Sequence, residues 1–300
     1  MFIIITADSQ FNNYLKLLRM KAIPTLLICL AFVSSVFAQE PYQHPRLTKT
    51  WELHNGLKTT ESVLYDPSEK VLYVSSINEN PWQKDGNGYI SKISSNGTVI
   101  SLKWATGLSA PKGMGISHGS LFVTNIDEVV EFNLKDGSLT GRYTHPKAIN
   151  LNDIAVNQEG IVYVSDSKGD CIYSISEKKL EILSDSPEVK ASNGLYVKNG
   201  LLLCGQNNRI ISVNLKSGEI NTYIDNTGGI DGLESVGLKT YVFSDWSGHV
   251  YMVEPGKEKM LLLDTTPLKV NAADIGYNRS DGILYVPTFF NDGVVAYKLD

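Results

Sequence analysis

The chain has 300 residues, 42% of them hydrophobic, with a formal net charge of −5 and three cysteines. The length supports one sizeable core, and the lack of any basic run excludes nucleic acid as the expected partner. Cys29 lies in the N-terminal leader. Cys171 and Cys204 neither form a disulfide framework nor have metal-site spacing, so we predict that both are buried small hydrophobic residues.

Residues 20–38 have the organisation of an export signal. They open on a short basic start, continue with an apolar run and end on small residues, so we predict cleavage after Ala38. A membrane anchor is the alternative, but the apolar run is short for a span. The bulky residue before Cys29 also makes that cysteine a poor lipidation site. We therefore expect residues 1–19 to reflect a wrongly chosen start codon, and the mature chain to be exported, periplasmic or extracellular, with no membrane span.

From Thr60 onward the chain repeats one pattern of short β-rich segments separated by turns containing Gly, Asn and Asp. Six copies can be aligned on the first strand of each. The aligned positions are Glu61, Lys112, Asn152, Asn193, Asp231 and Ala273, which are 51, 40, 41, 38 and 42 residues apart. Four strands per unit at a period of about 40 residues indicate a propeller blade. We predict an all-β, six-bladed β-propeller over residues 39–300.

The expected strands follow this repeat in chain order. They are 61–66, 70–76, 89–94 and 98–104 in blade one; 113–117, 120–125, 129–134 and 138–144 in blade two; 152–156, 161–166, 171–175 and 179–185 in blade three; 193–197, 200–205, 209–215 and 219–224 in blade four; 231–235, 239–245, 249–254 and 258–264 in blade five; and 273–277, 282–288 and 293–299 in blade six. Blade six lacks a fourth strand. Residues 47–53 alternate like a strand, so we predict that they pair with its outer edge and close the ring.

The first strand of each blade of a propeller lines the central channel, so the aligned positions form a ring of side chains. Glu61, Asn152, Asn193 and Asp231 bring carboxylate and carboxamide oxygens to this ring. Calcium takes about 6–8 oxygen ligands, with water filling the remainder. We predict that these four residues hold a divalent cation, Ca²⁺. The alternative is a polar, water-filled channel without a metal.

The ring resembles that of the calcium-dependent six-bladed propellers of the gluconolactonase, regucalcin and luciferin-regenerating-enzyme family, with diisopropylfluorophosphatase and paraoxonase as wider relatives. The corresponding pairs in this chain are Glu61-Ser62, Asn152-Asp153, Asn193-Gly194 and Asp231-Gly232. The ordered set is in register with the repeat and spans nearly all of residues 60–300. The resemblance implies a calcium at the floor of an active site and hydrolysis of lactones, esters or phosphotriesters.

Three residue types would supply the chemistry. Asp231 is expected to activate a water or to attack directly. Lys112 departs from the family pattern: it can stabilise a developing oxyanion, anchor an acidic substrate, or pair with Glu61 or Asp231. His145, in the loop before blade three, is a candidate acid or base. Asp153 and Asp274 follow the ring by one position, and we expect them to point away from the channel and make structural hydrogen bonds.

The loops after the second strands are predicted to form the channel mouth. They contribute aromatic and acidic side chains, namely Trp82, Asp166, Asp245, Trp246, Phe289 and Phe290. Such a mouth suits a small organic molecule or a sugar-like ring as substrate. The alternative for each aromatic residue is a plug between blades. For His118 and His249 a surface position is the expectation.

The chain has no Gly-rich phosphate loop, no GxSxG elbow and no HExxH helix motif. The resemblance, together with the export signal, implies an exported, calcium-dependent hydrolase that acts on a small lactone or ester. Two alternatives stay open because the same fold serves several functions. One is a non-catalytic propeller that binds a small ligand or a partner protein. The other is a propeller with condensation chemistry like that of strictosidine synthase.

Overall fold

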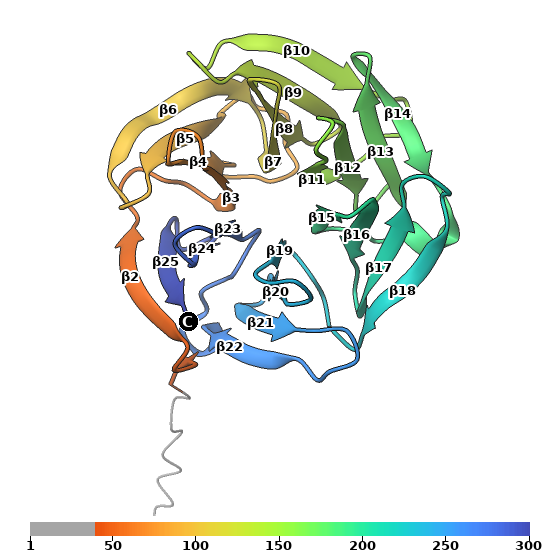
Figure 1. Cartoon of the computed structure of the whole chain (residues 1–300). Helices are drawn as coiled ribbons and strands as arrows, with labels where there is room; N and C mark the ends of the chain where they lie inside the picture. The colour runs from red at the N-terminus through yellow and green to blue at the C-terminus, as the bar shows by residue number, and fades with distance from the viewer. Residues whose placement is uncertain (1–39) are drawn as a thin grey trace, which may run out of the picture. The chain divides into compact units, whose positions relative to one another are not determined.

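Six small antiparallel sheets surround a central axis (Figure 1). The computed structural model describes residues 40–300; the predicted export signal and its cleavage site lie outside the described residues. The arrangement is a six-bladed β-propeller, so the predicted fold class is confirmed. Within residues 40–300, no helix is long and apolar enough to cross a membrane.

Within each sheet, consecutive strands of the chain are neighbours; blades five and six each gain one more strand from the start of the described chain. Blade one contains β3 (Thr60–Asp66), β4 (Val71–Ser76), β5 (Gly88–Ser94) and β6 (Val99–Leu108); blade two contains β7 (Pro111–Ser117), β8 (Ser120–Asn125), β9 (Glu128–Asn133) and β10 (Leu139–Thr144). Blade three contains β11 (Leu151–Val156), β12 (Val162–Asp166), β13 (Cys171–Ser176) and β14 (Lys179–Ser184); blade four contains β15 (Leu195–Lys198), β16 (Leu201–Gly205), β17 (Arg209–Asn214) and β18 (Ile220–Asp225).

Blade five contains β19 (Leu233–Ser235), β20 (Tyr241–Asp245), β21 (His249–Val253) and β22 (Met260–Asp264). Blade six contains β23 (Gly276–Asn278), β24 (Ile283–Pro287), β25 (Val294–Leu299) and, from the other end of the described chain, β2 (Leu47–Leu53). Two short 3₁₀ helices, η1 (Pro187–Val189) and η2 (Thr266–Leu268), lie in the loops that lead into blades four and six.

The ring closes through β2, which pairs with the outer edge of β25 (Figure 1). The antiparallel register runs from Leu47 opposite Leu299 to Leu53 opposite Val294. The predicted closure by residues 47–53 is therefore confirmed. The two-residue strand β1 (Tyr42–Gln43), which the sequence did not predict, adds a fifth strand to blade five by pairing with β22.

The core consists of apolar layers between neighbouring blades. One buried cluster occupies each of the six interblade spaces, including the space between blades six and one. Because each sheet is covered on both faces, the middle strands are rich in apolar residues; β4, for example, is buried along its whole length and its first four residues are apolar. Cys171 and Cys204 are buried in these layers with free thiols, as predicted.

Candidate active site in the central channel

The inner strands of neighbouring blades approach so closely that several positions accept only glycine. A Cβ on Gly194 would lie 2.6 Å from the carbonyl oxygen of Asp231, and a Cβ on Gly232 would lie 2.4 Å from the backbone nitrogen of Ile275. Either side chain would push two blades apart. Blade packing therefore requires the glycine of the Asn-Gly and Asp-Gly pairs, and the residue before each glycine is the one that carries a side chain into the ring.

In other blades an aspartate at the same position binds the next blade. Asp153 accepts hydrogen bonds from the backbone N–H of Ile154 and of Leu195 in blade four, both at 2.6 Å. Asp274 accepts one from the Ser62 hydroxyl of blade one at 2.5 Å. The predicted structural hydrogen bonds of these two aspartates are therefore present. Contrary to the expected direction, both line a cavity of about 50 Å³ in the channel, further along the inner strands than the ring.

A hydroxyl near the end of the second strand supports the ring from behind in four blades. These hydroxyls belong to Ser75, Thr124, Ser165 and Ser244. Thr124 donates to the carbonyl oxygen of Asn152, and Ser244 to that of Ala273, each at 2.6 Å. These four residues were not predicted from the sequence. They could have been found there, because a Ser or Thr recurs at the same place in aligned copies of the repeat.

The residue that follows this Ser or Thr in the sequence holds the loop that leads into the ring. Asp166 is fully buried, and its carboxylate accepts backbone hydrogen bonds from Ile149, Asn150 and Gly169 at 2.6–2.9 Å. Its oxygens are used inside the protein, so the structure does not bring this carboxylate to the mouth, where the sequence analysis expected it. Asn125 performs the same task in blade two, where it accepts from Ala110 and the residue before it.

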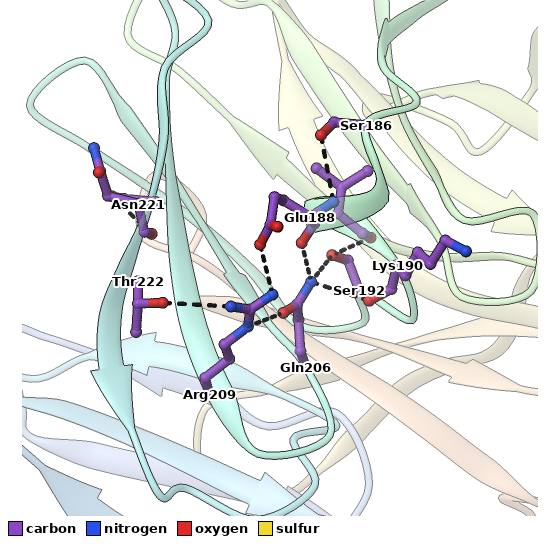
Figure 2. A network of polar contacts seen from close by, with 10 residues as sticks. Ser186, Glu188, Lys190, Ser192, Gln206, Arg209, Asn221 and Thr222 are labelled. Carbon is purple, nitrogen blue, oxygen red and sulfur yellow. Dashed lines mark hydrogen bonds and ion pairs between the residues drawn. The ribbon is translucent and has the colours of Figure 1, made fainter.

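In blade four, the side chain of Gln206 holds the loop that leads into the ring (Figure 2). The side-chain nitrogen of Gln206 donates to the carbonyl oxygens of Glu188 at 2.7 Å and Lys190 at 3.0 Å, and Arg209 donates to the Gln206 side-chain oxygen at 2.8 Å. Arg209 also pairs with the Glu188 carboxylate at 2.9 Å. The loop before Asn193 is thus held on both sides. The backbone N–H of Asn193 then donates to Gly205 at 2.8 Å, which sets its register.

The ring itself combines two carboxylates with two carboxamides. The Asn193 side-chain N–H donates to Oδ1 of Asp231 at 2.8 Å. Three oxygens are left buried without a hydrogen-bond donor: Oε2 of Glu61, Oδ1 of Asn193 and Oδ2 of Asp231. Asn152 is also buried at its ring position. Buried oxygens normally have a partner, so this donor set fits a hard cation such as calcium.

The electrostatics of the two carboxylates agree with that fit. Burial raises the pKa of Asp231 to about 6, against the opposing effect of the Asn193 hydrogen bond. Burial also raises the pKa of Glu61 well above its usual range, although the Lys112 ammonium opposes the shift. Within residues 40–300, no group of three or more His, Cys, Asp or Glu side chains has metal-binding geometry. Any cation in this ring would therefore depend on the two amides.

Lys112 and Ala273 occupy the other two ring positions, and both are buried. Within residues 40–300, no carboxylate lies within ion-pair distance of Lys112; its Nζ lies 5.2 Å from the centroid of the Trp82 ring instead. A direct ion pair with Glu61 or Asp231 is therefore not formed. Ala273 belongs to a small apolar cluster with Ile77, Ala110, Ile126 and Phe289, so one side of the mouth is apolar.

Three aromatic rings meet beside blades five and six. The Trp246 ring lies edge-on to Phe289 and Phe290, with centroids 5.5 and 5.8 Å away. Trp246 and Phe290 are exposed, whereas Phe289 is buried and supports them. Asp245, also predicted at the mouth, contacts His249 at 2.8 Å and is partly buried.

His145 is the one candidate catalytic residue that the structure does not bring toward the ring. Its imidazole lies 5.3 Å from the Tyr173 ring, centroid to centroid. It lines a surface groove with residues of β10 and β14, the outermost strands of blades two and three. A loop residue has no alternation to fix its direction, and here the loop turns outward.

No known protein family and no curated protein matches the sequence. Solved structures do match. A gluconolactonase from Xanthomonas campestris has a TM-score of 0.65 at 14% identity, over 85% of this chain and 89% of its own. A streptogramin B lyase has a TM-score of 0.58 at 14% identity, over 87% and 98%. A catalytically inactive virginiamycin B lyase from Staphylococcus aureus, with quinupristin, has 0.57 at 14%, over 87% and 100%. The chain thus resembles a gluconolactonase and two lyases in fold.

Proposed function

We propose that this protein is an exported, calcium-dependent hydrolase of a small lactone or ester. The observation that carries the proposal is the set of three buried oxygens without donors, on Glu61, Asn193 and Asp231. They come from blades one, four and five, and only the folded ring assembles them. The shared fold with a gluconolactonase supports the reaction class, and the signal-like segment 20–38 supports export.

Glu61, Asn152, Asn193 and Asp231 would hold the cation. When bound, calcium supplies a Lewis acid that polarises the substrate carbonyl and stabilises negative charge on its oxygen. The Asn193 amide holds Oδ1 of Asp231, so Oδ2 is the oxygen available toward the channel. A carboxylate beside the attacking water is suited to take a proton from it.

Lys112 is proposed to stabilise the negative charge that develops during hydrolysis. Its ammonium belongs to the same ring and has no ion pair within residues 40–300. It would donate to the carbonyl oxygen as negative charge develops there. The apolar cluster around Ala273 and Phe289 would cover the other side of the substrate and exclude water from it.

Hydrolysis by the purified mature chain tests the proposal. A panel of a lactone, an aryl ester and a phosphotriester is assayed after chelator treatment and after calcium is added back. We expect lactone or ester turnover only with calcium, and less with magnesium, because magnesium demands stricter octahedral geometry. Bound calcium with no turnover of any substrate in the panel would contradict the hydrolase and favour a non-catalytic binding propeller.

A further inference from the structure

Two lysine ammonium groups lie over one indole ring at the channel mouth. Nζ of Lys168 is 3.5 Å and Nζ of Lys112 is 5.2 Å from the centroid of the Trp82 ring. Trp82 belongs to the loop between β4 and β5, Lys112 to β7, and Lys168 to the turn between β12 and β13. Blades one, two and three therefore contribute to one cluster, which we call the Lys–Trp cluster (Trp82, Lys112 and Lys168).

The loop of blade one is fastened over blade two. Lys84 in this loop forms an ion pair with Asp127 of blade two at 2.6 Å. The backbone N–H of Gly86 donates to the Ser109 hydroxyl at 3.2 Å. These contacts place Trp82 above the inner strand that carries Lys112, with 55% of its surface still exposed to solvent. The Trp82 ring is therefore fixed in position, and it is open to a ligand together with the exposed side chain of Lys168.

Neither lysine of the cluster has a carboxylate partner. Among residues 40–300, no carboxylate oxygen lies within ion-pair distance of Lys112 or Lys168. Lys112 is only 4% exposed, and a buried ammonium without an anion is costly. The carboxylates whose fields reach Lys112 are those of Glu61 and Asp231, and the proposed function assigns both to the cation.

Three carboxylates near the mouth have partners within the protein. Asp127 pairs with Lys84, Asp166 accepts backbone N–H groups inside blade three, and Asp245 contacts His249. With the cation compensated by its two carboxylates, the two ammonium groups of the Lys–Trp cluster keep their positive charge. A positive site with an aromatic face attracts an anion with an apolar or ring-shaped body.

We infer that the substrate is an acidic lactone or ester, whose negatively charged group lies against the Lys–Trp cluster over blades two and three. The inference rests on the proposed function and narrows its substrate class. Blade five lies across the ring from blade two (Figure 1). The apolar part of the substrate would therefore face the exposed rings of Trp246 and Phe290 on the opposite side.

Calorimetry with a pair of inert probes tests this inference without turnover. Benzoate and its neutral isostere benzamide are titrated into the calcium-loaded mature chain at low salt. We expect a preference for benzoate of about 10- to 100-fold, the size of a charge-assisted hydrogen bond. A carboxylate can also ligate the cation, so a preference for benzoate alone does not identify the Lys–Trp cluster. The decisive quantity is the change in that preference when Lys168, which is exposed and lies outside the ring, is replaced in Lys168→Met.

Lys168→Met should reduce the preference about tenfold and leave benzamide binding unchanged. The matched control is Lys216→Met, which removes the same charge from an exposed turn after β17 and should change nothing. An unchanged preference in Lys168→Met would overturn the inference even if lactones are hydrolysed. A preference lost in Lys168→Met without any hydrolysis would uphold anion selection and refute only the hydrolase.

Discussion

Blades two and five lie opposite each other in the ring and share one kind of interblade contact, but their ring residues carry opposite charges. Each has a ring residue followed by glycine, Lys112-Gly113 and Asp231-Gly232. A Cβ on Gly113 would lie 2.5 Å from Cα of Asp153, just as a Cβ on Gly232 would lie 2.4 Å from the next blade. The interblade contact therefore dictates the glycine and leaves the ring side chain free to vary. Packing constrains the glycine, and the residue before the glycine supplies the chemically active side chain of the channel.

The largest effect should come from removing the negative charge in blade five. Asp231→Asn keeps the size of the side chain and one oxygen ligand but removes the base or nucleophile. Turnover should fall by about two to four orders of magnitude, whereas calcium affinity should weaken only modestly. Kinetics and calorimetry on the same preparation measure both. Equal turnover in the variant and the wild type would remove Asp231 from the chemistry.

Removing the positive charge in blade two should have a smaller and separable effect. Lys112→Met should lower turnover about 10- to 100-fold, because one donor to the developing oxyanion is lost. Calcium affinity should stay the same or rise, since a like charge has left the ring. Tighter calcium with undiminished turnover would mean that Lys112 only repels the ion.

The two glycines should respond alike, in contrast to the two ring residues. Gly113→Ala and Gly232→Ala should each lower the free energy of unfolding by about 1–3 kcal/mol, because the new Cβ overpacks an interblade contact. Denaturant melts measure this, and Gly119→Ala is an instructive comparison because space around that residue is open although its φ is positive. A neutral result at Gly232 alone would show that the two blades are not packed equivalently.

The last effect concerns the cavity further along the channel, where Glu234 lies. Burial, helped by the charge of Asp153, raises the pKa of Glu234 to about 8, although Arg279 opposes the shift. The folded chain then keeps a proton that the unfolded chain releases at about pH 4.3, so this group's stabilisation is lost as pH rises through about 8. Glu234→Gln should flatten the loss of stability of the calcium-free protein between about pH 5 and 8. Parallel pH profiles for both proteins would contradict this assignment.

Strand periodicity predicted those parts of the molecule in which alternation fixes a side chain's direction. The repeat predicted six blades, the closing strand 47–53 and the positions of Glu61 and Asn152 on inner strands. In blades four to six, Asn193, Asp231 and Ala273 precede the assigned strands β15, β19 and β23, and backbone hydrogen bonds hold them in register.

Loops were less predictable because their side chains have no such alternation. Asp166, the last residue of β12, was expected at the mouth, yet backbone N–H groups of the neighbouring loops hold its carboxylate inside the protein. His145, a loop residue expected to act as an acid or base, lies outward against Tyr173. The two-residue strand β1 is too short to give a periodic signal. The Lys–Trp cluster depends on a loop of one blade crossing to the next, which a repeat alignment cannot reveal.

Calcium titration of the chelator-treated mature chain by calorimetry tests directly whether the ring binds a cation. We expect one site per chain, and we expect Asp231→Ala to remove most of the binding, because a carboxylate contributes more than an amide to a divalent ion. Binding should also raise the melting temperature by mass action, since the unfolded chain cannot assemble ligands from four blades. Extracellular calcium sites bind with dissociation constants of up to about 1 mM. If no calcium binds at that concentration, the ring is only a polar channel.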